Sequence, residues 1–441
     1  MRERAGRIGS GWRIAAAGWL AMLVACAPAP EPDVDPGPFT RIEPLELPLE
    51  GTSSQPDLVA APDGHWLLGW VEPADGDDGD DDSERKRHRL RFSLTGEGGE
   101  WMPPRTIAEG GNWFLNWADT PHVYALADGT LWAHWLRSTG PGRMDYGIDL
   151  VHSGDGGMSW SRPRMVNLVD SPGDHGFTSF WPQADGQLGI AWLDSREKAA
   201  AGRTGHDDAH DEDGHGDGAP MMLRAATYSP GRLRPIRMEE WPLDLSTCDC
   251  CTTAAAVTDR GPVVVYRGRD AGEIRDTRIV RFEDGAWTRP RDVHRDGWMM
   301  PGCPVNGPVV AAHGNTVWVA WYTQAGGVPE VRIARSDDAG DRFWAPVTVA
   351  KGPHVLGRAT LALAGEHVLV GWMEETDTQR LRLARFDAGL EAPPYKLEVA
   401  TLDVRGRASG LPKLAVQGDE ARIVWTDVVD GRPVLRGARI L

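Results

Sequence analysis

Three cysteines lie within four positions of the chain, in the segment STCDCCTTAAAV at residues 246–257. A fourth stands in MMPGCPVNGP, and the remaining cysteine of the chain lies near its start. Thiols spaced this closely can bind a soft metal ion, form disulfides or act as a redox pair. The residues concerned are Cys248, Cys250, Cys251 and Cys303, with the thioethers Met299 and Met300 beside the last.

The sequence leaves all three chemistries open. A disulfide from Cys303 to one of the triplet would be structural, whereas bridges within the triplet would close small strained rings and leave thiols over. Several thiolates with a methionine sulfur suit Cu(I), and thiolates alone suit Zn²⁺. A strained bridge is of the reducible kind. Copper or zinc at the thiol cluster is therefore the one cofactor that the sequence indicates.

The N-terminal residues predict the compartment. Four arginines precede an apolar run from Ile14 to Ala25, which is too short for a membrane span, and Cys26 follows at once. The segment LVAC resembles the lipobox of bacterial lipoproteins, which implies a signal peptide at residues 1–25 and a lipidated Cys26. Residues 26–38 form a Pro-rich tether. We expect a lipid anchor in a bacterial membrane, in the outer membrane and facing the periplasm or the cell surface.

The charge of the chain excludes one class of partner. The formal net charge is -17, and removal of the first 25 residues, with four arginines and one glutamate, makes it -20. Such an acidic surface repels nucleic acid, and no basic stripe offsets it. We therefore expect no nucleic-acid binding.

A repeated pattern predicts the elements that position the thiols. Each copy has a short apolar strand, a turn with Gly, Asp or Asn, and an alternating strand that ends in an aromatic residue. Two more strand-like stretches separate successive copies, and four strands per unit make a β-propeller blade. We predict an all-β propeller at residues 39–441 with seven blades, six being the alternative, and with residues 39–50 as the strand that closes the ring. The aromatic residues are Trp70, Trp135, Trp192, Tyr266, Trp321, Trp372 and Trp425.

The turns between third and fourth strands carry a known signature. SGDGGMSW and SDDAGDRF match the Asp-box, S-x-D-x-G-x-[ST]-[FW], except that Arg342 replaces the small hydroxyl residue, and SLTGEGGEW is a degraded copy. The carboxylate accepts turn amides and the glycine permits positive φ, so the boxes are structural. With these boxes the chain resembles the sialidase-like, BNR-repeat superfamily. The box residues are Ser153, Asp155, Gly157, Trp160, Ser336, Asp338, Gly340 and Phe343.

The resemblance implies a test of enzymatic function. Sialidases of this superfamily carry an arginine triad, a Tyr-Glu nucleophile pair and an acidic Asp, and the first arginine lies in an F/Y-R-I-P motif. This chain has Gln55 before Pro56 there, while the similar string around Arg41 falls on the closing strand. Tyr266 and Tyr322 alone end second strands. A sialidase-type glycoside hydrolase is therefore the rival of our leading hypothesis.

That leading hypothesis is a binding or accessory module for a glycan, a peptide or an envelope protein. In a propeller, the loops that enter first strands and the loops after second strands open at one end, so the thiols should cluster there with several polar side chains. Arginines beside carboxylates can bind an anionic group or bridge blades. These candidates are Asp194, Arg196, Tyr266, Arg267, Arg269, Arg275, Asp276, Asn306 and Tyr322. An inserted acidic loop adds a weak metal site, or merely a solvated loop, with His206, His210 and His215.

Overall fold

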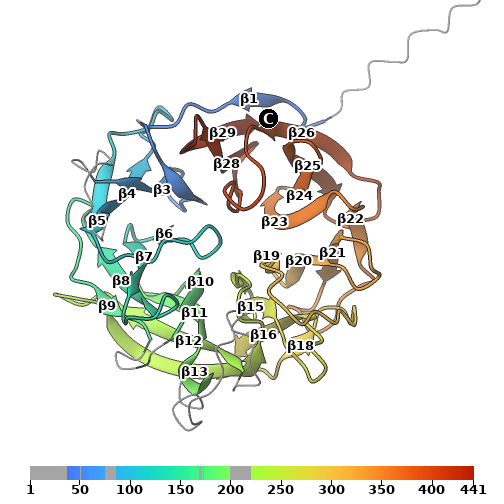
Figure 1. The fold of residues 1–441 in the computed structure, drawn as a ribbon, viewed down its shortest axis with the longest axis horizontal. Helices are drawn as coiled ribbons and strands as arrows, with labels where there is room; N and C mark the ends of the chain where they lie inside the picture. The colour runs from blue at the N-terminus through green and yellow to red at the C-terminus, as the bar shows by residue number, and fades with distance from the viewer. Residues whose placement is uncertain (1–36, 50, 75–85, 168–170, 172, 199–219) are drawn as a thin grey trace, which may run out of the picture. The chain divides into compact units, whose positions relative to one another are not determined.

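The computed structural model describes residues 37–441, except 50, 75–85, 168–170, 172 and 199–219. The predicted signal peptide, Cys26 and the three loop histidines lie outside the described residues. Residues 38–441 form one compact unit. Its strands build seven antiparallel sheets that follow one another around a ring (Figure 1). The seven-bladed propeller predicted from the repeats is confirmed.

The blades follow the order of the chain. Blade 1 contains β2 (Ser54–Ala60), β3 (Trp66–Pro73), β4 (His88–Leu94) and β5 (Arg105–Gly110). Blade 2 contains β6 (His122–Ala125), β7 (Leu131–Ser138), β8 (Tyr146–Ser153) and β9 (Arg164–Met165). Blade 3 contains β10 (His175–Pro182), β11 (Leu188–Asp194), β12 (Met221–Ser229) and β13 (Ile236–Thr247).

The remaining blades complete the ring. Blade 4 contains β14 (Ala254–Thr258), β15 (Gly261–Arg267) and β16 (Thr277–Glu283), and two short strands, β17 (Ala286–Trp287) and β18 (Arg291–Asp292), both pair with β16. Blade 5 contains β19 (Val309–His313), β20 (Thr316–Thr323), β21 (Glu330–Ser336) and β22 (Val347–Lys351). Blade 6 contains β23 (Val355–Ala364), β24 (His367–Glu375), β25 (Gln379–Asp387) and β26 (Tyr395–Leu402). Blade 7 contains β27 (Lys413–Gln417), β28 (Glu420–Val429), β29 (Arg432–Ile440) and β1 (Ile42–Pro44).

Every predicted aromatic residue lies on the second strand of a blade and is buried. Trp192 and Trp321 have no exposed surface, and Trp70 and Trp372 are almost as deeply buried. Large rings on successive blades fill the wedges between the sheets, which is where an alternating strand gains most from burying its apolar face. The aromatic residue that recurs in the sequence therefore recurs in the hydrophobic core, once in each blade. Among the described residues, no helix has the length and apolarity needed to cross a membrane.

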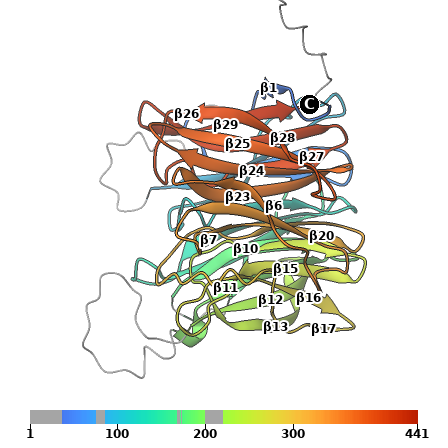
Figure 2. The ribbon, with the colours of Figure 1, turned by 90° about the vertical axis from the view of Figure 1, so that its right-hand side faces the viewer.

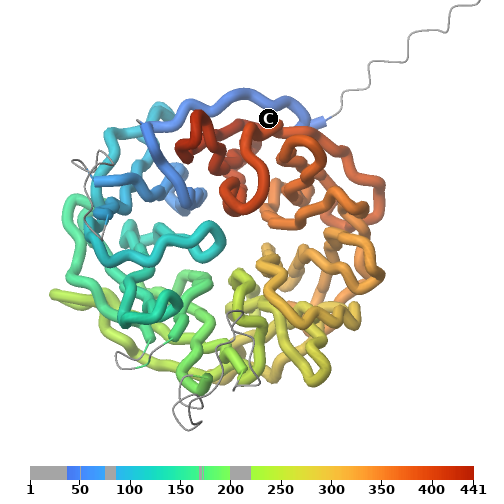
Figure 3. The backbone as a smooth tube through the Cα atoms, viewed as in Figure 1, coloured from blue at the N-terminus to red at the C-terminus, as the bar shows by residue number. Residues whose placement is uncertain are grey.

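The first strand of the chain closes the ring. β1 pairs with β29 in antiparallel register, with Ile42 opposite Ile440 and Pro44 opposite Ala438. In Figure 1 this blue strand lies beside the red end of the chain, and Figure 3 shows the backbone passing through seven successive units between them. Figure 2 views the same ring from its edge. The predicted closure is confirmed, and it covers the edge that β29 would otherwise expose.

Both complete Asp-boxes form the predicted turn. The hydroxyl of Ser153 donates to Asp155 over 2.7 Å and accepts the amide of Gly157 over 2.9 Å, and the Asp155 carboxylate accepts the amide of Ser159 over 2.9 Å. Ser336 repeats the first two contacts at 2.8 and 2.9 Å with its own aspartate and glycine. Arg342, the departure from the pattern, keeps the backbone contact because its amide donates to the box aspartate over 2.8 Å, but it lacks the hydroxyl that Ser159 donates to Asp155 in the first box.

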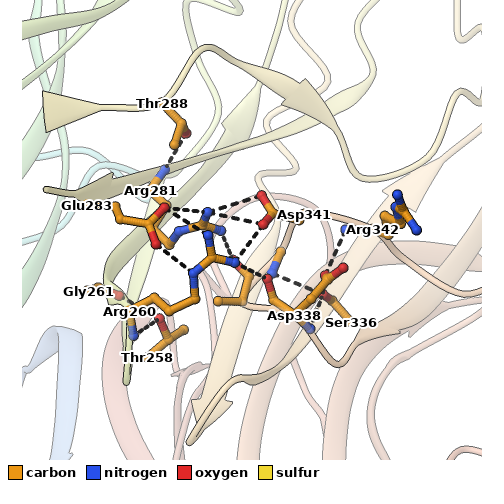
Figure 4. A network of polar contacts seen from close by, with 12 residues as sticks. Thr258, Arg260, Gly261, Arg281, Glu283, Thr288, Ser336, Asp338, Asp341 and Arg342 are labelled. Atoms are coloured by element: carbon orange, nitrogen blue, oxygen red, sulfur yellow. Dashed lines mark hydrogen bonds and ion pairs between the residues drawn. The ribbon is translucent and has the colours of Figure 1, made fainter.

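The second Asp-box also joins blades 4 and 5 (Figure 4). The buried Arg281 on β16 donates to the carbonyl of Ala339 over 2.6 Å and to Asp341 over 3.1 Å. Arg260 reaches the same Asp341 over 2.6 Å, and both arginines also bind Glu283. The box thus contributes an inter-blade network as well as a local turn.

Candidate functional site

A cavity of about 250 Å³ lies at the centre of the ring. The first strands of all seven blades, or the residues just before them, line it: β2, β6, β10, β14, β19, β23 and β27. Inner strands placed side by side around an axis enclose a central space, which their side chains fill only in part. The cavity is somewhat below the roughly 300–1,000 Å³ of typical small-molecule pockets. It therefore suits a single small ring or the end of a chain.

One wall of the cavity carries a polar triad from three blades, formed by Asp57, His122 and Lys413. The Asp57 carboxylate lies 3.2 Å from Nδ1 of His122 and 3.6 Å from Nζ of Lys413, and it accepts the amide of Val123 over 2.9 Å. Burial alone would raise the pKa of Asp57, but the charges of His122 and Lys413 and these hydrogen bonds lower it to about 2. Asp57 is therefore an ionised acceptor between two donors.

The carboxyl group of Asp119, on blade 2, has a pKa that is shifted in the opposite direction to that of Asp57. Asp119 accepts the amide of Phe177 over 2.7 Å and the hydroxyl of Tyr146 over 3.1 Å. Burial raises its pKa to about 7, although these two hydrogen bonds act the other way, and the charge of Asp174 raises it further. Two carboxyl groups that line one cavity thus differ in pKa by several units, which is how an acid and a base are separated in active sites.

β-Bulges on three inner strands change the direction in which the neighbouring residues face. Gln55, Phe177 and Arg358 have φ values of 53°, 52° and 52°, and the register of each inner strand shifts beside them. A β-bulge adds a residue and turns the following side chains, and non-glycine residues in this region carry strain. The bulge at Gln55 precedes Asp57, and the bulge at Phe177 presents the amide that Asp119 accepts.

The thiols lie at the connection from blade 3 to blade 4. The amide of Cys248 donates to the carbonyl of Arg267 over 2.9 Å, and two residues after Cys251 the hydroxyl of Thr253 donates to the carbonyl of Phe177 over 2.8 Å. Thr252 and Thr253 then line the cavity. The triplet therefore occupies the rim of the cavity, in a loop that is fixed at both ends.

The described thiols are all free, and they contact one another. The sulfur of Cys248 is 3.4 Å from that of Cys251 and 3.8 Å from that of Cys250. Burial disfavours the Cys248 thiolate, yet its hydrogen-bond contacts with the other two thiols and the charge of Arg275 hold its pKa well below the usual range. Burial and the contact with Cys248 raise the pKa of Cys251 to about 12. Cys303 is exposed and joins the group through Cys250, whose hydrogen bond lowers the Cys303 pKa.

Arg267 is used inside the protein. Its guanidinium is 2% exposed and donates to the carbonyls of Arg275, Asn306 and Tyr322 over 2.7 to 3.1 Å while lying over the ring of Trp298. Arg267 therefore links blades 4 and 5. The sequence offered such bridging between blades as the alternative to ligand binding, with carboxylates as partners. The partners in the structure are backbone carbonyls.

Arg275 faces the thiols. It donates from Nη1 to the sulfur of Cys248 over 3.2 Å and from Nη2 to Glu273 over 2.6 Å. Arg269 also binds Glu273 over 2.6 Å and lies 3.8 Å from Asp249, which in turn binds Lys198 over 3.0 Å. Charged side chains from blades 3 and 4 thus surround the loop.

The other predicted residues have structural contacts. Asp194 accepts Trp192 Nε1 over 2.8 Å and pairs with Arg196 over 2.7 Å. Asp276 accepts the amides of Gly297 and Trp298 over 2.9 and 3.0 Å.

Asn306 and Tyr266 also contact other segments. Asn306 donates to the carbonyl of Leu356 over 3.1 Å and accepts the amide of Arg358 over 2.6 Å, which holds blade 5 to blade 6. The hydroxyl of Tyr266 donates to Asp244 over 2.6 Å.

The aromatic and thioether candidates divide between core and surface. Tyr322 packs edge-on against Trp298 with ring centroids 5.5 Å apart. Met300 packs against that same core, while Met299 is 68% exposed.

The sequence did not single out the cavity residues Asp57, Asp119, His122 and Lys413, or Tyr146, which binds Asp119. They come from blades 1, 2 and 7 and belong to no shared motif. One local signal was present, because SQPDL and WADTPHV each place an aspartate just before or within an inner strand. Only the ring brings these aspartates to the same cavity.

Comparisons with known proteins find similarity only to solved structures, at low sequence identity. No family model matches the chain, and no curated protein matches it. A protein of unknown function from Dyadobacter fermentans shares 14% identity with a TM-score of 0.48 over 88% of this chain and 94% of its own. The structure itself shows the fold, a seven-bladed β-propeller with two Asp-box turns.

Two enzymes of known activity are similar at a greater distance. A Hadza microbial sialidase shares 16% identity with a TM-score of 0.41 over 73% of this chain and 63% of its own. An α-L-arabinofuranosidase from Fusarium graminearum shares 13% identity with a TM-score of 0.44 over 88% of this chain and 93% of its own. At these values the likenesses leave the activity of this propeller open.

Proposed function

We propose that this chain is an envelope lipoprotein whose propeller binds the end of a glycan in its central cavity. The observation that carries the proposal is the lining of the cavity, to which all seven blades contribute residues and in which polar side chains from six of them surround one small space. Saccharides present several hydroxyl groups that both donate and accept, so they need mixed polar partners beside an apolar face.

The cavity offers that combination. Asp57 accepts, Lys413 donates, and the hydroxyls of Thr120 and Thr178 do either. Phe180 lies edge-on to His122 and supplies an aromatic surface at the same wall. A sugar ring could therefore stack on the aromatic residue while its hydroxyls reach the polar triad.

The proposal is tested by calorimetry with the full chain and a panel of mono- and oligosaccharides. We expect at least one saccharide to bind, and Lys413→Met to weaken its binding about tenfold or more, because a partly buried charged donor is lost beside Asp57. Lys351→Met is the matched control, since this lysine pairs with Glu330 on an outer strand. Absence of binding across the panel, or equal loss in both variants, would contradict the proposal.

The lipoprotein part of the proposal rests on the N-terminal sequence, in which Cys26 directly follows the apolar run. Cells grown with a labelled fatty acid should incorporate the label into the chain, and Cys26→Ala should abolish that incorporation and release the protein from the membrane fraction. A variant that stays labelled and membrane-bound would refute the anchor.

Glycoside hydrolysis is a second candidate, because a carboxyl with a pKa of about 7 and an ionised carboxylate line the same cavity. An exo-sialidase needs arginines for its substrate carboxylate, and the described residues that line the cavity include none. A panel of fluorogenic glycosides distinguishes the two functions. Turnover that disappears in Asp119→Asn would make the protein a hydrolase, and lack of turnover with intact binding would make it a binding module.

A further inference from the structure

We propose that Cys248, Cys250 and Cys251 form a binding site for one Cu(I) ion at the rim of the cavity. The site is separate from the cavity itself, and it does not depend on the proposed glycan ligand. These three residues each offer a sulfur, and the sulfurs all lie within 4.8 Å of one another.

The spacing of the sulfurs fits ligation of a single ion. Thiolates bound at about 2.3 Å stand about 3.8 Å apart around a tetrahedral ion and about 4 Å apart around a trigonal one. In the structure, the separations from Cys248 are 3.4 Å to Cys251 and 3.8 Å to Cys250. A disulfide would require about 2.05 Å, so the sulfurs are placed as ligands of an ion and not as bonded pairs.

The loop holds this arrangement before any ion arrives. Cys248 follows the buried Thr247, whose hydroxyl donates to the carbonyl of Met221 over 3.1 Å, and its own amide is bonded to Arg267. Beyond Cys251, the Thr253 hydroxyl is bonded to β10. Cys248 and Cys251 are 1% and 2% exposed, so most of the ordering cost of the site belongs to folding and not to binding.

Cationic side chains beside the thiols compensate the negative charge of the proposed copper site. Three thiolates with one Cu(I) carry a net charge of about -2, which is costly in a buried place unless cations lie close. Arg275 donates directly to the sulfur of Cys248, and the charge of Arg267 also acts on Cys251. Hydrogen bonds to ligand atoms of this kind orient the ligands and tune the metal.

The ligand set favours Cu(I) over the alternatives. Thiolates select soft ions, and Ca²⁺ or Mg²⁺ would need oxygen ligands. Structural Zn²⁺ sites take four ligands. A fourth thiol would have to come from the exposed Cys303, which contacts Cys250 from another loop. Cu(I) needs only the three thiols, and so Cys303 separates the two ions experimentally.

The test uses the full-length chain, purified under reducing and oxygen-free conditions and titrated with Cu(I) against a chromogenic chelator. We expect one Cu(I) per chain, a thiolate-to-copper absorption band, and an X-ray absorption spectrum with sulfur ligands alone. Cys248→Ser and Cys251→Ser should each lower the affinity about 100-fold or more, and Arg275→Met about tenfold. Circular dichroism establishes that each variant remains folded.

Two control variants complete the experiment. Cys26→Ser and Cys303→Ser should both retain one Cu(I) per chain. The proposal is overturned by nitrogen or oxygen ligands in the absorption spectrum, or by unchanged affinity in the Cys248 and Cys251 variants. Stoichiometric Zn²⁺ that needs Cys303, together with no Cu(I) uptake, would overturn it as well. The spectrum of the unmodified protein decides the matter even where a variant unfolds.

Discussion

Asp119 accepts a hydrogen bond from the hydroxyl of Tyr146 over 3.1 Å, and both groups are almost fully buried. The tyrosine ring is stacked on Phe114 with centroids 3.9 Å apart, which fixes its position. The two hydrogen bonds of Asp119 do not offset its burial, and the pKa of the carboxyl therefore rises to about 7. The propeller thus holds a carboxyl group that changes charge near neutral pH.

The first prediction concerns stability between about pH 4 and pH 7. In this range the unfolded Asp119 has lost its proton while the folded one keeps it, so the free energy of unfolding falls as pH rises, by up to about 1.4 kcal/mol per pH unit. Thermal melts across this range should show that fall, and Asp119→Asn should reduce it. The exposed Asp419→Asn is the control, and an equal pH profile in both variants would refute the assigned pKa.

At lower pH, the titration of Asp57 should change the stability of the protein in the opposite direction to that of Asp119. The folded pKa of Asp57, about 2, lies below the usual value near 4, so the stability that it contributes is present above about pH 4 and is lost as pH falls toward 2. Asp57→Asn should therefore cost stability at pH 6 and cost much less at pH 2.5. Chemical denaturation at the two pH values measures this, and a constant loss would show that the ion pairs do not set the pKa.

Two arginines of the inter-blade network bind Asp341, and we expect their substitution to lower the free energy of unfolding by different amounts. Arg281→Met should lower the free energy of unfolding by about 2–4 kcal/mol, because the side chain is 4% exposed and leaves buried partners unpaired. Arg260→Met should cost far less, since that arginine is solvent-exposed. Urea denaturation of both variants checks the difference. Equal losses would contradict the role given to burial.

Ring closure predicts the effect of truncation. Deleting residues 1–36 should leave the melting temperature unchanged, whereas deleting residues 1–48 removes β1 and exposes the edge of β29. A loss of about 2 kcal/mol would lower the Tm by roughly 2–3 °C, because the entropy of unfolding scales with chain length and the propeller has about 400 residues. Calorimetry of the two truncated chains measures the difference, and equal melting temperatures would mean that β1 contributes nothing to closure.

The fold could be predicted because its signals are local and repeated. Trp192, Trp321 and the other second-strand aromatics recur with turn residues before them, and the strands left over after Trp425 required an N-terminal partner. The thiols could be placed together for the same reason, since both cysteine segments precede first strands of neighbouring blades.

The cavity could not be predicted in the same way. Asp57 meets Lys413 only because the last blade lies beside the first, and Asp119 meets Phe177 only because a bulge turns that amide inward. Arg267 looked available for a ligand because its acceptors are backbone carbonyls, which no side-chain pattern reveals. Contacts of this kind depend on strand register and on bulges, and neither can be read from residue types.

A crystal structure of the full chain with the saccharide that binds it best is the most direct test of the glycan proposal. We expect the terminal sugar within the central cavity, with hydroxyl groups at hydrogen-bond distance from Lys413 and Asp57 and a ring face against Phe180. A sugar bound on the outer strands, with the cavity empty, would contradict it.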